Sequence, residues 1–200
     1  LFGLRRGVAS ERLVPELERA GSHVVELGIP FSDPVADGPV IQRAGGRALA
    51  HRYRMADYLQ AVNRIRDKSE VPLLLFSYFN PIFQYGLEAL ARDARAAGVD
   101  GVLVTDIIPE EAEQYRACME AQELDCIFLA APTSGEERIA KIARCSGGFV
   151  YVVSRTGVTG ARQELSDSVL PTVERVRKFT RLPVAVGFGI YTPDQVQAVW

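Results

Sequence analysis

Short apolar runs alternate with longer amphipathic stretches along this chain of 200 residues, and this alternation strongly constrains its fold. The runs are almost continuously apolar, which is typical of strands buried on both faces of a parallel sheet. Repeated strand–helix units predict a parallel sheet with right-handed crossovers. The expected strands are His23–Leu27, Leu73–Ser77, Gly101–Val104, Cys126–Leu129, Phe149–Val153 and Pro183–Val186. The expected helices are Met55–Lys68, Leu87–Ala97, Pro109–Ala121, Glu136–Ala143, Val169–Phe179 and Pro193–Val199.

Local signals indicate where several helices begin. Pro109 suits the first helical position, and acids follow it in the first turn. Ser134 and Glu137 have the spacing of a capping box. Pro15 disfavours a helix interior, so the first helix is expected to begin only near Val14.

Length and charge exclude several classes of protein. We expect a single domain over residues 1–200, because this length can bury a sizeable core. A net charge of −2 offers no basic field for nucleic acid or for an anionic membrane. We also expect no membrane span and no signal peptide. Three scattered cysteines suit reduced thiols and a cytoplasmic location better than disulfides or a metal site: Cys118, Cys126 and Cys145.

Acidic residues gather in the stretch from Glu26 to Gln42, which begins at the end of the first expected strand. Glu26 can be a catalytic acid or an ion-paired glutamate, because an unpartnered buried carboxylate is costly. Asp37 precedes Gly38-Pro39, a context in which aspartate commonly bonds nearby backbone. Asp33 fits a structural or interfacial role in a Ser-Asp-Pro turn. The residues alone therefore leave the roles of these acids open.

The same pattern fits a doubly wound sheet and a closed barrel equally well, because both place functional groups after strand ends. Five motifs, in order, resolve this choice. The sequence ELGIPFSDPVADGP resembles the signature of the tryptophan synthase alpha subunit family. The further motifs are Phe79-Asn80-Pro81, VLVTD over 102–106, YVVSRTGVTG over 151–160, and VGFGI over 186–190. The resemblance covers nearly all of the chain.

The resemblance implies an eight-stranded TIM barrel, of which this sequence would lack most of strand one and all of strand eight. It also implies the retro-aldol cleavage of indole-3-glycerol phosphate to indole and glyceraldehyde 3-phosphate. Glu26 would carry the acid/base steps, and Asp37 would stabilise positive charge at the indole N–H. The indole would lie among strand-end side chains whose alternative role is plain core packing: Phe76, Leu103, Thr105, Leu129 and Tyr151.

Glycine-rich segments follow the last two expected strands. Such loops let backbone N–H groups approach a phosphate, although each signal by itself is weak. Phosphate binding is therefore expected at Thr159, Gly160, Gly187, Phe188 and Gly189. In the family the first of these loops is a mobile lid, and Arg155 is expected to help lock its closed form.

The resemblance further implies a partner, the tryptophan synthase beta subunit, in an α2β2 complex. Asp33, Pro34 and Asn80 are expected at that interface. No cofactor is expected in this chain, and pyridoxal phosphate would belong to the beta partner. The alternatives are a standalone lyase that releases free indole, another phosphate-handling barrel enzyme, and a purely regulatory partner. Retention of both acids argues against the last.

Overall fold

The computed structural model describes residues 8–153, 169–187, 190 and 192–199. The strands are β1 (Val25–Gly28), β2 (Leu73–Ser77), β3 (Gly101–Val104), β4 (Asp125–Ile127), β5 (Leu129–Ala130), β6 (Val150–Val153) and β7 (Val184–Gly187). The helices are α1 (Val8–Arg19), α2 (Pro39–Leu49), α3 (Met55–Arg66), α4 (Phe79–Tyr85), α5 (Leu87–Ala97), α6 (Glu113–Glu120), α7 (Glu136–Cys145), α8 (Val169–Arg177) and α9 (Pro193–Val199). None of these helices is long and apolar enough to cross a membrane.

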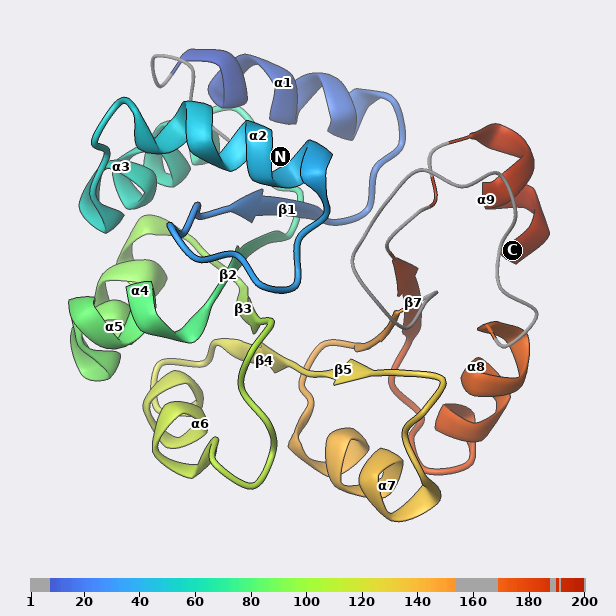
Figure 1. Cartoon of the computed structure of the whole chain (residues 1–200). Helices are drawn as coiled ribbons and strands as arrows, with labels where there is room; N and C mark the ends of the chain where they lie inside the picture. Colours follow the sequence, from blue (N-terminus) through green and yellow to red (C-terminus); the bar gives the residue numbers. More distant parts are fainter. Residues whose placement is uncertain (1–7, 154–168, 188–189, 191, 200) are drawn as a thin grey trace.

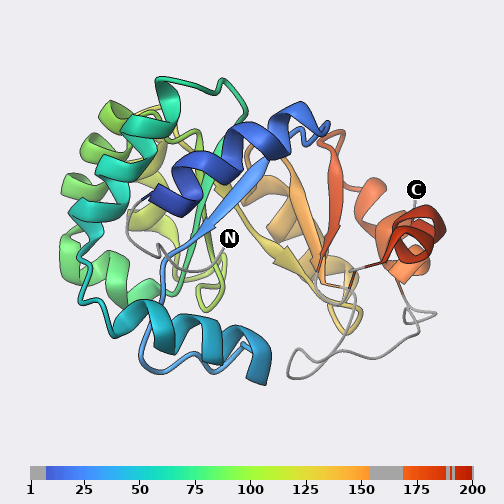
Figure 2. The same ribbon diagram turned by 90° about the horizontal axis from the view of Figure 1, so that it is seen from above.

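The strands pair in the order of the chain, and every recorded pairing is parallel. They follow one another along an arc, with α3 to α8 on its outer side (Figure 1). The view from above shows the same separation of inner strands from outer helices (Figure 2). Because all strands run the same way, the loops that follow them gather at one end of the arc.

The expected strand Cys126–Leu129 is divided in the structure. Its first part, β4, pairs with β3, and its second part, β5, pairs with β6. The backbone N–H of Tyr151 donates to the carbonyl oxygen of Phe128 at 3.1 Å, so the hydrogen bonding continues across the division. The arc is therefore continuous from β1 to β7.

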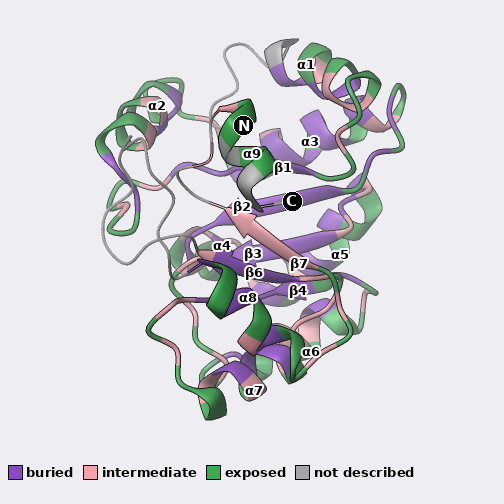
Figure 3. Cartoon of the chain, turned by 90° about the vertical axis from the view of Figure 1, so that its right-hand side faces the viewer, coloured by how far each residue is buried: buried purple, intermediate pink, exposed green. Residues whose placement is uncertain are grey.

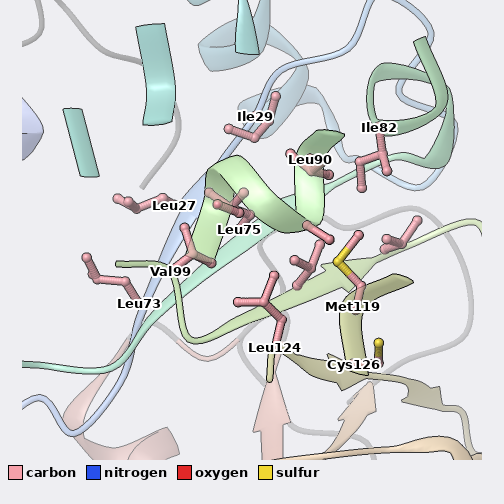
Figure 4. Close-up of a cluster of buried hydrophobic side chains, with 14 of the residues drawn as sticks. Leu27, Ile29, Leu73, Leu75, Ile82, Leu90, Val99, Met119, Leu124 and Cys126 are labelled. Carbon is pink, nitrogen blue, oxygen red and sulfur yellow. The ribbon is translucent and has the colours of Figure 1, made fainter. Parts of the chain in front are cut away.

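The two faces of the strands are both apolar, as the continuous runs predicted. Every residue of β2 and β3 is buried. The outward face packs against the helices in the larger core, which includes Leu27, Leu73, Leu75 and Cys126 (Figure 4). Figure 3 shows the central strands buried, whereas β7 is only partly covered.

Three expected helix starts are wrong. Helix α1 already includes Val8, the first described residue, and contains Pro15 in its interior, because packing on α3 outweighs the local effect of the proline. Helix α6 begins at Glu113 rather than at Pro109. Ser134 does not cap α7, whose N-cap is Gly135, because its hydroxyl accepts the N–H of Ala131 at 3.1 Å.

Two helices were not expected. Helix α2 follows the acidic loop and begins with Pro39 at its first position. Helix α4 directly follows β2 and includes the Phe79-Asn80-Pro81 motif. Both lie on the connections that leave the carboxyl ends of strands, so they shape the rim of the expected site.

Candidate active site

The inner face of the arc brings side chains from separate strands into one apolar cluster. Leu74 and Phe76 come from β2, and Leu103 comes from β3, where it pairs in register with Phe76. Ile127 and Tyr151 complete the cluster, and Leu129 packs against it. The structure thus brings Phe76, Leu103, Leu129 and Tyr151, the residues expected around an indole ring, together in one buried apolar cluster.

Glu26 lies on the same inner face, because it pairs in register with Leu74 of the cluster. Burial raises the pKa of its carboxyl group above the ordinary glutamate value. The nearby negative charge of Glu26 also contributes, after burial, to raising the pKa of Tyr151. Glu26 is therefore a carboxyl group beside an aromatic ring, in surroundings that favour its protonated form.

Among the described residues, Asp37 is the only acidic residue that is buried, with 5% of its surface exposed. Burial raises the pKa of its carboxyl group, and a hydrogen bond from the Tyr78 hydroxyl opposes that shift. The Tyr78 hydroxyl also accepts the backbone N–H of Ala36 at 3.0 Å. One tyrosine from the β2–α4 junction thus fixes the loop that carries Asp37.

Tyr78 is a site residue that the sequence analysis missed. It stands directly after the strand Leu73–Ser77 and directly before the Phe79-Asn80-Pro81 motif. Its side chain is 3% exposed, and burial raises its pKa to about 12, so the hydroxyl stays protonated and able to donate. The sequence signal that could have identified Tyr78 is an aromatic residue with a hydroxyl group directly after a predicted strand.

Thr105 and Gly187 lie at the carboxyl ends of β3 and β7. The Thr105 hydroxyl donates to the carbonyl oxygen of Ser77 at 3.3 Å, so it ties two strand ends together. A Cβ at Gly187 would lie 1.7 Å from the hydroxyl oxygen of Tyr151. Only glycine therefore fits beneath that tyrosine. The other expected phosphate and lid residues lie outside the described residues: Arg155, Thr159, Gly160, Phe188 and Gly189.

The residues expected at a partner interface lie on the loop that carries Asp37 and in the first turn of α4, which Tyr78 joins. Asp33 and Asn80 are exposed, and Pro34 is half-buried. Two apolar side chains stand beside them in sequence, Val35 at 78% exposure and Phe83 at 60%. The rim near the active site thus exposes large apolar groups, which is typical of interaction surfaces.

A cavity of about 910 Å³ borders the inner face of the strands. Glu26, Tyr151 and Ala185 line it, together with residues nearer the amino ends of the strands. Four expected site residues do not line it: Asp37, Phe76, Leu103 and Leu129. The cavity therefore contains only the Glu26 side of the candidate site. Within the described residues, no His, Cys, Asp and Glu side chains form a group of three or more that could hold a metal ion.

Parallel strands around an apolar interior, with the half-buried Glu26 within a strand and the buried Asp37 in the loop that follows it, define an enzyme of the α/β-barrel class. The family model for the tryptophan synthase alpha chain matches residues 5–200. The chain belongs to the tryptophan synthase alpha chain family.

Individual relatives agree with this assignment. The tryptophan synthase alpha chain of Solibacter usitatus is 58% identical over 184 residues, which are 92% of this chain and 69% of that protein. The alpha chain of Geobacter sulfurreducens is 52% identical over 191 residues, with 96% and 72% covered.

Solved structures extend the likeness to the fold. Mycobacterium tuberculosis tryptophan synthase matches with a TM-score of 0.88 and 41% identity, covering 96% of this chain and 73% of that one. The Pyrococcus furiosus tryptophan synthase complex matches with a TM-score of 0.85 and 34% identity, covering 94% and 75%. The barrel expected from the sequence is therefore confirmed as the fold class.

Proposed function

We propose that this chain cleaves indole-3-glycerol phosphate to indole and glyceraldehyde 3-phosphate, with Glu26 and Asp37 as its catalytic acids. The observation that carries the proposal is the position of Glu26. Its carboxyl group has a raised pKa and lies on the apolar inner face beside Tyr151. A carboxyl group with a pKa nearer neutrality can both give and take a proton at working pH.

The chemistry assigns two proton transfers to Glu26. It donates a proton to C3 of the indole ring, which turns the ring into a good leaving group. It also accepts the proton of the glycerol hydroxyl, as the carbon–carbon bond breaks and an aldehyde forms. The electron pair of that bond passes to the indole, so charge and atoms balance without an external oxidant or reductant.

Asp37 acts at the indole nitrogen. Protonation at C3 places positive charge on the ring N–H, and a carboxylate that accepts this hydrogen bond stabilises the charge. Burial strengthens such an interaction because little water competes for either group. The bond from Tyr78 favours the ionised form of Asp37, which is the form that this role requires.

The apolar cluster supplies the ring pocket. Phe76, Leu103, Leu129 and Tyr151 offer flat or branched apolar surface, which suits an indole. Thr105 is proposed at the pocket edge, and Gly187 at the phosphate end. The phosphate would reach the loops after β6 and β7, where barrels commonly bind this group.

We also propose association with a tryptophan synthase beta subunit, since structures of this family include the α2β2 complex of Pyrococcus furiosus. Asp33, Pro34 and Asn80 would face that partner, beside the exposed Phe83. The proposed carbon–carbon cleavage needs only proton transfers from side chains to assist it, so this chain would need no cofactor, and pyridoxal phosphate would reside in the partner. The free thiols of Cys118, Cys126 and Cys145 suit a reducing, cytoplasmic location.

The direct test replaces Glu26 by glutamine in the full-length protein. Indole release from indole-3-glycerol phosphate should fall at least about 100-fold, because the amide keeps the shape but cannot transfer a proton. Glu174→Gln, on the exposed face of α8, is the matched control and should keep wild-type turnover.

Release should be measured with and without the beta subunit. Near wild-type turnover by Glu26→Gln would remove Glu26 from the mechanism. Full activity without any association with the beta subunit would instead favour a standalone lyase.

A further inference from the structure

Helix α4 begins at a junction that touches the candidate site. Tyr78 is its N-cap residue and has extended backbone angles, and Phe79 is the first helical residue. The first N–H groups of a helix have no partner within the helix. The N–H of Phe79 finds one in the next loop of the rim, where it donates to the Asp106 Oδ1 atom at 2.6 Å.

The other end of Tyr78 holds the loop of Asp37. Its ring lies 5.5 Å from the ring of Phe31, centroid to centroid, and its hydroxyl bonds both Ala36 and Asp37. Tyr78 is almost fully buried, so neither its ring nor its hydroxyl has room to move alone. A shift of its backbone would therefore displace the hydroxyl from Asp37.

Asp106 itself is held in place. It follows Thr105, whose N–H and hydroxyl both bond the carbonyl oxygen of Ser77, at 3.0 Å and 3.3 Å. Ser77 precedes Tyr78, and Thr105 precedes Asp106. Hydrogen bonds therefore join the ends of β2 and β3 directly before Tyr78 and Asp106. The hydrogen bond from the Phe79 N–H to Asp106 lies just beyond these bonds, and it joins the end of β3 to the start of α4.

We propose that Asp106 is a positioning residue of the lyase reaction, which fixes the start of α4 and so aims the Tyr78 hydroxyl at Asp37. Asp106 is exposed and does not belong to the apolar pocket, so it acts through Tyr78 rather than on substrate. The inference rests on the proposed function of Asp37. If the inference holds, the loop after β3, which carries Asp106, also affects turnover.

The consequence is a loss of rate without a matching loss of binding. If Asp37 stabilises charge that develops only as the indole is protonated, its displacement lowers kcat more than it raises KM. Asp106→Ala should therefore lower kcat about ten-fold, since small misplacements of catalytic groups are costly. Asp106→Asn keeps an oxygen that can accept the N–H of Phe79, so it should retain most of the activity.

The chain offers a closely matched control. Asp57 is half-buried and also accepts a backbone N–H at a helix start, that of Arg54 before α3, at 2.7 Å. Asp57→Ala removes the same kind of bond far from Asp37 in the chain. The two alanine variants should lose similar free energy of unfolding in urea, whereas only Asp106→Ala should lose kcat.

The experiment measures kcat and KM for indole release by the full-length chain in complex with its beta partner. Asp106→Ala is combined with Tyr78→Phe, and the double variant should be no slower than Tyr78→Phe alone, because both changes break one chain of contacts. Three results would each overturn the inference. The double variant could lose kcat by the product of the two single losses, Asp106→Ala could keep an unchanged kcat, or Asp57→Ala could lose as much kcat as Asp106→Ala. Absence of indole release by the wild-type chain would overturn the proposed function itself.

Discussion

Glu26 and Asp37 are acids at positions where burial disfavours their charged forms. A folded-state pKa above the unfolded-state value means that the folded chain binds the proton more tightly. The resulting stability is complete below the unfolded-state pKa and is lost as pH rises through the folded-state pKa. At neutral pH both residues therefore carry a cost to the fold, which is common where catalysis needs a perturbed group.

Replacement of Glu26 by glutamine should remove that cost at high pH. At about pH 8, Glu26→Gln is expected to raise the free energy of unfolding by up to about 1 kcal/mol, and the gain should vanish at about pH 4. Urea denaturation at both pH values measures this. The exposed Glu174→Gln serves as control, and a gain that is independent of pH would contradict burial of the Glu26 charge as the cause.

Between elements, Arg66 joins the end of α3 to the starts of two strands. Its guanidinium donates to the carbonyl oxygens of Gly98, Ser69 and Val71, and it pairs with Asp100. Arg66 therefore satisfies several carbonyl groups before β2 and β3, at the ends of these strands opposite the active site. A planar group with five donors suits this position, whereas the point charge of lysine does not.

Removal of this side chain should destabilise the fold without altering the acids. Arg66→Ala is expected to lower the free energy of unfolding by about 2–3 kcal/mol, because partly buried carbonyls and Asp100 lose their partner. Arg95→Ala is the control, since its ion pair with Glu123 is exposed and should be worth less than about 1 kcal/mol. Both free energies of unfolding are measured in urea. Equal losses in the two variants would show that the hydrogen bonds from Arg66 to the backbone carbonyl oxygens contribute nothing to stability.

For the whole molecule, the rim of loops at the carboxyl ends of the strands has two roles in the proposed function. Its inner side holds Asp37 through Tyr78, and its outer side presents Val35 and Phe83 to solvent. A partner that covers the outer side would therefore touch the same rim that holds Asp37, the proposed catalytic acid. This arrangement lets association and turnover be examined separately.

Phe83→Ser should weaken association with the beta subunit by about ten-fold or more, because large aromatic side chains commonly dominate interface energies. Indole release by the uncomplexed chain should stay unchanged, since Phe83 is largely exposed and does not belong to the apolar cluster beside Glu26. Analytical ultracentrifugation gives the affinity. Leu13→Ser, on the exposed part of α1, is the control, and similar affinity for both variants would place the interface elsewhere.

The sequence by itself determined the parallel α/β architecture and the positions of the main acids. Strands such as Leu73–Ser77 and Gly101–Val104 were predicted with their observed bounds, because burial on both faces leaves a continuous apolar run. Glu26 was identified as a candidate because a carboxylate at the end of an apolar run is costly to bury unless it has a partner or a function.

Only the tertiary structure decided which groups meet. Pro15 lies inside a helix because packing against α3 outweighs a local preference. Tyr78 and Asp37 are 41 residues apart in number, and nothing in either local sequence specifies their hydrogen bond. Asp106 reaches the start of α4 only because β2 and β3 are neighbours in register. Local patterns fix strands and helices, whereas contacts between loops depend on how the strands are arranged around the barrel.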